Sequence, residues 1–598
     1  MEKIGSILRY ERENKNISRE KLCCGLCTAQ MLNKIEDNKC ETDKLLMDIL
    51  FQRLGKSPDK LELIISEEEY KKICERDDID MLICKNRLNK AEQKLETYMA
   101  QFEKKMYAHQ MYYYRTKAYI LLQQGKYIQA YELIENAVEL TIPKWKSKQM
   151  TEYYISTYEM ENLLVYGVTL YKMEREAEAL EHIDKCLKYI TTHFGDREEY
   201  AKIYPKCVCV LAKLCLSKEY DERVVGLCEE GMALLRKESI SYLMIPLMEE
   251  LIYRYERNSE KEMAVRWEKY VEVLKDVYKE LEVDMDLGYL YFRPAQCEIH
   301  LDYETVRGER RAKDITQEKL IEGVYSSAET LSRVENRRTS PTKNKFEGLM
   351  QNLDMDKTRY NTFMVSTSFE VLEMKNELDD YLEGYEIESA YKKLTEIEQK
   401  LDMTIADNRR FVDNIKNSLE RIQGKITPEE ALEKAVKLLR ETYDYEKECN
   451  RPPMRNEAIL IAQVDAILEQ MGRLEEASNI VERVLKICDR SKVQASHRFR
   501  SYIMLCTHYE RRLEDKCDID TIPYTRKLLK LELSVGKGSG IGDGMMIIAS
   551  YYVDTDVDEE KCKEALKKSY HLYNLFMQRF YANEIAEFYK NKYNEEIY

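Results

Sequence analysis

The sequence predicts an all-α protein in which a small helical head and a longer helical-repeat body occur in the same order twice. Three observations favour this fold. Only 10 Pro and 20 Gly are spread through 598 residues, so long helices are seldom interrupted. Pairs of amphipathic helices recur along the chain. The chain also matches itself at an offset of about half its length.

The composition is that of a globular protein, with 44% hydrophobic and 34% charged residues. These values exclude collagen-like, low-complexity and wholly disordered chains. No apolar run approaches the roughly 18 residues of a membrane span, and the first residues lack the apolar core of a signal peptide. We therefore expect a cytoplasmic protein, in which the 17 Cys act as small core hydrophobes and not as a disulfide framework.

The self-match is strongest between residues 9–25 and 307–323, which are identical at 9 of 17 positions at an offset of 298. About one identity would arise by chance. The identical pairs include Arg12/Arg310, Lys15/Lys313, Ile17/Ile315, Leu22/Leu320 and Gly25/Gly323. Beyond Gly25 the offset becomes 299, as in Glu36/Glu335, and it returns far downstream at 124–126 and 423–425. This pattern predicts a tandem duplication of a unit of about 299 residues.

The first residues of each unit predict three short helices. In the first unit Ile4, Ile7 and Leu8 recur at helical spacing and indicate a helix that stops before residues 14–16. A second helix is expected from Ser18 to Gly25. Thr28 is a natural N-cap for a third helix, whose buried positions would be Leu32 and Ile35.

Two short helices joined by a Gly-containing turn form the helix-turn-helix arrangement. The segments ISREKLCCGLCTAQMLNKIEDN and ITQEKLIEGVYSSAETLSRVENRR resemble the helix-turn-helix of the Cro and lambda-repressor type. The first copy has the shorter turn, with Cys followed by a hydroxyl residue, that is seen in the Rgg and PlcR type of peptide-responsive bacterial regulators.

The resemblance implies binding of double-stranded DNA, with the third helix in the major groove. It places the N-caps Thr28 and Ser327 on phosphate, together with Arg19 and Gln317 at the start of the second helices. The implied base-facing positions are Ala29, Gln30, Met31 and Lys34 in the first copy and Ala328, Glu329, Thr330 and Arg333 in the second. Gln30 can pair with adenine, and Glu329 can accept a hydrogen bond from cytosine.

The distribution of charged residues favours DNA binding by the second copy more than by the first. The chain has a net charge of −15, yet residues 1–64 hold 12 Lys and Arg against 11 Asp and Glu, and residues 303–360 hold 12 against 10. In the second copy Arg337 and Arg338 follow the third helix, with Lys343 and Lys345 behind them. Because DNA affinity comes largely from phosphate neutralisation, we expect this copy to carry most of it.

The remaining residues of each unit read as paired helices. In residues 118–141 one helix ends at Gly125, a left-handed cap position, and the next begins five residues before Ala130, whose small side chain allows close packing. Gly472 and Ala477 repeat this spacing in the second unit. These pairs resemble long tetratricopeptide repeats (TPR), four or five per unit, which implies a superhelix with a concave face for an extended peptide. In the resembling regulators Asn side chains bind the peptide backbone, and the positions to test are Asn162, Asn456 and Asn479.

No residue pattern points to catalysis, to a cofactor or to a metal. The glycines at 536–544 fit no phosphate loop and indicate a break between helices. Cys23, Cys24 and Cys27 lack a fourth ligand at zinc spacing, and the 7 His are isolated.

The predicted domains are head 1 (1–64), body 1 (65–285), a linker (286–302) that packs and is not a free tether, head 2 (303–360) and body 2 (361–598). This organisation predicts a DNA-binding regulator whose bodies sense a ligand, with a short peptide favoured. Because one chain supplies two heads, we expect a monomer that acts as a pseudo-dimer, or a homodimer of such chains. The alternative is an interaction protein that sequesters a protein partner and whose heads no longer bind DNA.

Overall fold

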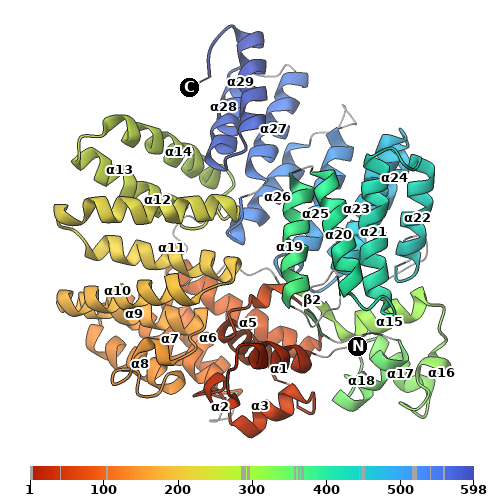
Figure 1. Ribbon diagram of the computed structural model, residues 1–598, viewed down its shortest axis with the longest axis horizontal. Helices are drawn as coiled ribbons and strands as arrows, with labels where there is room; N and C mark the ends of the chain where they lie inside the picture. Colours follow the sequence, from red (N-terminus) through yellow and green to blue (C-terminus); the bar gives the residue numbers. More distant parts are fainter. Residues whose placement is uncertain are drawn as a thin grey trace.

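The computed structural model describes residues 4–40, 42–102, 106–284, 291, 297–353, 355, 358–360, 364, 369–384, 386–443, 445, 451–514, 521–538, 540–555 and 559–597. In this part of the chain nearly all regular structure is helical, which confirms the predicted all-α class (Figure 1).

The two heads share four helices and a closing strand in the same order. Head 1 holds α1 (Ile4–Asn14), α2 (Arg19–Leu22), α3 (Ala29–Glu36) and α4 (Lys44–Arg53), then the 3-10 turn η1 (Pro58–Lys60) and the strand β1 (Leu61–Ile65). Head 2 follows the strand β2 (Glu298–Leu301) and holds α15 (Asp302–Ala312), α16 (Gln317–Leu320), α17 (Ala328–Glu335), α18 (Lys343–Asn352) and the strand β3 (Thr358–Tyr360). The predicted second helix is shorter than expected, because α2 ends at Leu22 and a turn follows.

Body 1 is a stack of antiparallel helix pairs. Its elements are α5 (Glu67–Cys84), α6 (Leu88–Met99), α7 (Tyr107–Gln123), α8 (Tyr127–Thr141), η2 (Met150–Glu152), α9 (Thr157–Lys172), α10 (Glu176–His193), α11 (Arg197–Leu214), η3 (Lys218–Tyr220), α12 (Asp221–Lys237), α13 (Met244–Arg257) and α14 (Lys261–Glu280). Each helix packs on the next in sequence, as in a helical-repeat solenoid.

Body 2 is built in the same way. It holds α19 (Phe369–Glu383), α20 (Ile387–Lys400), α21 (Ala406–Ile422), α22 (Pro428–Arg440), α23 (Arg455–Gln470), α24 (Leu474–Arg490), η4 (Ala495–Arg498), α25 (Phe499–Glu514), α26 (Ile522–Ser534), α27 (Ile541–Thr555), α28 (Glu559–Leu575) and α29 (Arg579–Tyr593). The break expected at 536–544 is shorter than predicted, since Gly542 and Gly544 lie inside α27. Their missing side chains leave room for Tyr573 and Leu529, so they serve packing and not a turn.

The turns within the pairs form as the residue spacing predicts. Gly125 and Gly472 end α7 and α23 with φ of +76° and +72°, which is the left-handed region. Ala130 and Ala477 are fully buried in α8 and α24, where each helix meets its partner. These positions therefore act as expected from the sequence.

A three-stranded sheet, which the sequence analysis did not predict, lies between the heads. Its strand order is β2-β1-β3, with β2 parallel and β3 antiparallel to β1. Glu62 of β1 pairs with Glu298 of β2, about 236 residues later in the chain, and with Arg359 of β3. The sheet thus joins the end of head 1 to both ends of head 2. Its strand β2 belongs to the predicted linker, of which residues 286–290 and 292–296 lie outside the described residues.

The two heads lie at the same end of the molecule, on either side of the sheet, and the bodies rise from them (Figure 1). At the opposite end α14 of body 1 packs on α28 of body 2. The backbone of Ser241 also donates a hydrogen bond of 3.0 Å to the carbonyl oxygen of Gly536. The two bodies are therefore in direct contact with each other.

Candidate nucleic-acid interface

The helices of head 1 begin where the sequence places their caps. The side chains of Ser18, Thr28 and Asp43 accept hydrogen bonds from the backbone N–H groups of Lys21, Met31 and Leu46. These bonds satisfy donors that a helix start leaves unpaired. Leu32 and Ile35 are buried as predicted, so the opposite side of α3 is turned to solvent.

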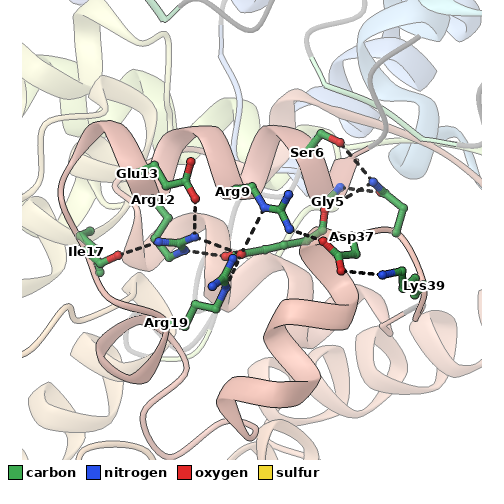
Figure 2. A network of polar contacts seen from close by, with 11 residues as sticks. Gly5, Ser6, Arg9, Arg12, Glu13, Ile17, Arg19, Asp37 and Lys39 are labelled. Atoms are coloured by element: carbon green, nitrogen blue, oxygen red, sulfur yellow. Dashed lines mark hydrogen bonds and ion pairs between the residues drawn. The ribbon is translucent and has the colours of Figure 1, made fainter.

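A buried carboxylate holds the first three helices of head 1 together (Figure 2). Glu36, at the end of α3, receives Arg12 Nε on Oε1 at 2.6 Å and Arg19 Nε on Oε2 at 2.6 Å. Arg12 also donates to the carbonyl oxygen of Ile17 at 3.0 Å. Its hydrogen bond to Glu36 raises the pKa of Arg12 further, so this guanidinium stays charged.

A second group of polar contacts lies at the same end of α3 and reaches the first turns of α1. Asp37 pairs with Lys39 at 2.9 Å and with Arg9, and these contacts lower the pKa of Asp37 (Figure 2). Asn38 accepts the backbone N–H of Gly5 at 3.0 Å and donates to the Ser6 hydroxyl at 3.2 Å. The C-terminal end of α3 is therefore held to α1 at two places, near Arg12 and near Gly5.

Head 2 repeats the central network at equivalent positions. Glu335 receives Arg310 Nε at 2.5 Å and Gln317 Nε2 at 2.7 Å, and Arg310 donates to the carbonyl oxygen of Ile315 at 3.1 Å. Lys15 and Lys313 donate to the carbonyl oxygens of Leu54 and Leu353, the C-cap residues of α4 and α18. The same contacts thus rigidify both heads.

The outer face of α3 carries the predicted base-facing residues of head 1. Gln30 and Lys34 are exposed, whereas Ala29 and Met31 are half-buried and pack against the core of the head. Thr28 is exposed and caps α3. Among these residues the structure therefore leaves Gln30 and Lys34 as the long polar side chains that face solvent.

In head 2 two predicted residues contact each other. Arg333 pairs with Glu329 one turn away at 2.7 Å, and both are exposed. Ala328 and Thr330 are half-buried, and the Ser327 hydroxyl lies 3.2 Å from that of Thr330. Since exposed pairs of this kind contribute at most about 1 kcal/mol, the Arg333 guanidinium can exchange Glu329 for a phosphate or a base.

Three other predicted DNA contacts are engaged inside the protein. Arg19 and Gln317 bind the buried Glu36 and Glu335 as described above. Arg337 forms a bidentate contact of 2.8 Å with Glu67 of α5 and lies 5.1 Å above the ring of Tyr303. Arg337 and Arg338, the two basic residues after α17 that were assigned to DNA, are both exposed, and Arg337 is engaged by Glu67.

The three predicted peptide-binding Asn lie in different surroundings. Asn162 of α9 is fully buried, and neither atom of its amide has a hydrogen-bond partner within the described residues. Asn456 of α23 is half-buried, with its Oδ1 unpartnered. Asn479 is exposed on α24, in an open pocket of about 400 Å³ beside Tyr445 and Arg483. The structure does not bring them into one site.

Sequence reasoning missed a buried row of charges inside body 1. Glu161 of α9 pairs with Arg115 of α7 at 3.3 Å and with Lys206 of α11. Tyr291 from the predicted linker lies against Arg115, at 4.7 Å from guanidinium carbon to ring centre, and hydrogen-bonds Thr116. No residue spacing signals this arrangement, because its members are separated by 40 residues or more in sequence.

A buried carboxyl group lies beside this row. The Tyr112 hydroxyl donates to Asp80 Oδ1 at 2.7 Å, and burial raises the pKa of Asp80 to about 7. Within the described residues no group of three or more His, Cys, Asp or Glu is placed to hold a metal ion. None of the helices described is both long and apolar enough to span a bilayer.

Comparison with known proteins gives structural neighbours only. The chain matches no protein-family model, and no curated protein matches its sequence. PlcR of Bacillus thuringiensis, solved in complex with the peptide PapR7 and DNA, is similar over 48% of this chain and 98% of its own, with 13% identity and a TM-score of 0.32.

Two further solved structures are similar at comparable identity and TM-score. The apo competence regulator ComR of Streptococcus vestibularis is similar over 48% of this chain and 97% of its own, at 14% identity and a TM-score of 0.30. The APC/C hetero-tetramer Cut9–Hcn1 covers 88% of this chain and 91% of its own, at 12% identity and a TM-score of 0.27. At these identities the likeness concerns the fold alone.

Proposed function

We propose that the chain is a DNA-binding transcription regulator whose helical bodies sense a ligand. The observation that carries this proposal is the pair of heads with equivalent Glu36 and Glu335 networks, located at one end of the molecule (Figure 1). Each network holds a short helix, α3 or α17, with one side buried and the other exposed. A rigid helix with an exposed polar face is what entry into the major groove requires.

The shared contacts also support a tandem duplication. Arg12 and Arg310, Ile17 and Ile315, and Glu36 and Glu335 occur at a near-constant offset and make the same hydrogen bonds. A duplicated chain would read DNA as a pseudo-dimer. Since Gln30 and Lys34 differ from Glu329 and Arg333, its two half-sites would differ in sequence, with centres about 34 Å apart or a multiple of that.

For the ligand we propose a short peptide bound by a body. Asn456, with an unpartnered amide oxygen, and the exposed Asn479 are the candidates that a peptide can reach. Asn162 would first need to be uncovered, because its side chain is fully buried. The acidic chain, at −15, should favour a neutral or cationic peptide over an anionic one.

DNA binding is tested by selection of genomic fragments with the purified full chain, at 50 to 200 mM salt as a rough range. We expect enriched sites and an affinity that falls with salt, by a slope of about 0.9 for each phosphate contacted. Arg333→Ala and Lys34→Ala should weaken binding by roughly 1 to 3 kcal/mol if they reach bases. Lys185→Ala, on the exposed side of α10, is the matched control for loss of a cation.

The stoichiometry of the selected complex tests the pseudo-dimer. Sedimentation and footprinting should find one chain across two unlike half-sites. Two chains on one perfect palindrome, each using a single head, would contradict it.

The alternative function is sequestration of a protein partner by a chain whose heads do not bind DNA. The observation that favours it is the engagement of Arg19, Gln317 and Arg337 within the protein. Absence of any salt-dependent fragment enrichment, together with recovery of one folded protein on the immobilised full chain, would decide for it.

A further inference from the structure

Three aromatic rings surround one point on body 1, near head 1. Tyr131 lies on α8, Tyr166 on α9, and Trp145 in the segment between these helices. The rings of Tyr131 and Tyr166 have centres 5.4 Å apart, and Trp145 meets Tyr166 edge to face at 4.9 Å. We call Tyr131, Trp145 and Tyr166 the aromatic cage.

The cage holds the side-chain ammonium of Lys146. Its Nζ lies 5.5 Å from the ring centres of Tyr131 and Trp145 and 5.7 Å from that of Tyr166. It also donates to the Tyr131 hydroxyl at 3.2 Å and pairs with Glu135. A cation within about 6 Å of several ring faces is the arrangement by which proteins recognise ammonium ligands.

Lys146 is not a fixed part of this arrangement. Its side chain is 47% exposed, whereas Tyr166 is 5% exposed and Tyr131 and Trp145 are half-buried, so the rings are held more firmly than their occupant. The indole N–H of Trp145 is buried and has no hydrogen-bond partner within the described residues. An unused donor beside a cation cage suits a ligand that carries both an ammonium group and an oxygen acceptor.

We propose that the aromatic cage is a binding site for an alkylammonium ligand, and that Lys146 occupies it in the absence of that ligand. Free quaternary ammonium compounds and the lysine side chain of a peptide share the required chemistry. The ligand's cation replaces the Lys146 ammonium between the three rings and next to Glu135, and Lys146 turns to solvent.

The site is placed to influence head 1, a step that rests on the proposed function. The carbonyl oxygen of Thr141, four residues before Trp145, accepts a hydrogen bond of 2.9 Å from Arg53 of head 1. A Cβ on Gly25, in the turn before α3, would lie 2.6 Å from the Leu140 carbonyl oxygen. Movement of the segment that follows Thr141 therefore reaches the turn that positions α3.

The chain supplies its own reporter for the test. It contains two Trp, so Trp267→Phe leaves Trp145 as the single source of indole fluorescence. In this background Lys146→Met removes the cation that the cage holds. The matched control is Lys148→Met, since Lys148 is also 47% exposed but lies above a single ring among the described residues, that of Tyr153.

Choline and its neutral isostere 3,3-dimethylbutan-1-ol are the probes, and Nα-acetyl-lysine amide represents a peptide lysine. We expect choline to quench Trp145 fluorescence saturably in the Lys146→Met protein. Choline should bind this protein roughly tenfold more tightly than the neutral isostere does, and roughly tenfold more tightly than it binds the Lys148→Met protein. A stronger response to Nα-acetyl-lysine amide than to choline would assign the site to a peptide, and the reverse to a free quaternary ammonium.

Two results would overturn the proposal. One is equal quenching by choline and its neutral isostere. The other is choline quenching that persists when Tyr166→Leu is added to Lys146→Met, with an unchanged circular-dichroism spectrum in both proteins. Fluorescence reports the cage without DNA, so a chain that binds choline but no DNA would refute the proposed function and leave the cage intact.

Discussion

Head 1 and head 2 have the same internal network but are attached to the rest of the protein in different ways. The buried residues of head 1, such as Leu22 and Leu32, belong to one continuous cluster with those of body 1. The buried residues of head 2, such as Leu320 and Leu331, form a separate cluster that adds Ile64 of β1 and Met454. Head 1 is thus continuous with its body, and head 2 is a distinct unit.

One pair of equivalent positions accounts for much of this difference. Arg53 donates to the carbonyl oxygens of Leu22 and Cys24 within head 1, and it reaches Glu159 and Thr141 of body 1. Asn352 of head 2 makes the matching local bonds, to Leu320 and Glu322, and is too short to reach a body. The longer side chain converts a local cap into an attachment.

Head 2 is attached on another side. Arg451, before α23, contacts Glu309 of α15 and binds Glu457 at 2.7 Å, and it lies against Gly308, where a Cβ would be 2.4 Å from its side chain. The turn before α17 stays open, since nothing lies within 4 Å of a Cβ on Gly323. Two heads with the same internal network can therefore be held to the bodies with different firmness, because the side chains that hold them lie outside that network.

The largest expected effect comes from removing the attachment of head 1. Arg53→Ala leaves the buried Glu159 without its cation and should destabilise α3 by about 3 to 5 kcal/mol. Asn352→Ala removes two local bonds and should destabilise α17 by about 1 to 2 kcal/mol. Amide hydrogen exchange of α3 and α17 in the full chain measures both, and equal losses would refute the comparison.

The two turn glycines should also differ. Gly25 and Gly323 have φ of +69° and +71°, so an alanine is strained by roughly 1 to 2 kcal/mol in either. Gly25→Ala also meets backbone atoms of Leu140 and Thr141 at 2.6 Å, which should add about 1 to 3 kcal/mol. Thermal unfolding should therefore show a lower midpoint temperature for Gly25→Ala than for Gly323→Ala. Equal midpoints would contradict the close packing of the Gly25 turn against Leu140 and Thr141.

One contact between the two bodies depends on pH. The contacts of Arg53 do not, because its guanidinium stays charged. His497 of η4 lies 2.8 Å from Asp77 of α5. Burial alone would lower the pKa of His497, but the Asp77 carboxylate raises it to about 9. Because the folded pKa exceeds the unfolded value of about 6.5, this stabilisation is complete below pH 6.5 and is lost as pH rises through 9.

The stabilisation lost over this pH range is at most about 3 kcal/mol. Solvent screening reduces it, because Asp77 is half-exposed. Hydrogen exchange at α5 should therefore speed up between pH 6.5 and 9, after correction for the intrinsic rate, while exchange at α3 should not. His497→Gln is the control and should abolish the difference. A change at α3 equal to that at α5 would contradict the assignment.

The smallest effect is expected for the contact of head 2 with α5. Arg337 and Glu67 are 37% and 41% exposed, so Arg337→Ala should destabilise the protein by about 1 kcal/mol or less, and less still at high salt. If Arg337 instead binds DNA in the complex, the same variant should lose more DNA affinity than stability. Parallel measurement of unfolding and DNA binding separates the two roles.

Much of the fold could be predicted because its signals are local. Gly125, Gly472, Ala130 and Ala477 take their expected places, since a helix end and a close helix pair impose their own residue types nearby in sequence. Thr28 caps α3 and Leu32 and Ile35 are buried for the same reason. The sheet escaped prediction because strands of three to five residues show no usable periodicity.

Less of the candidate site than of the fold could be predicted from the sequence. Its residues could be named by resemblance, but their partners could not. Nothing near Arg19 or Gln317 in sequence indicates that Glu36 and Glu335 engage them, and nothing near Arg337 points to Glu67, which is 270 residues away.

By itself, then, the sequence determined the all-α class, the paired helices of the bodies and the helices of the two heads, since these depend on hydrophobic spacing and caps within a few turns of chain. Only the tertiary structure decided how each head is attached, which exposed cations remain free, and that β1, β2 and β3 meet. Those outcomes depend on single side chains and short strands that are distant in sequence and adjacent in space, and such contacts leave no periodic pattern in the chain.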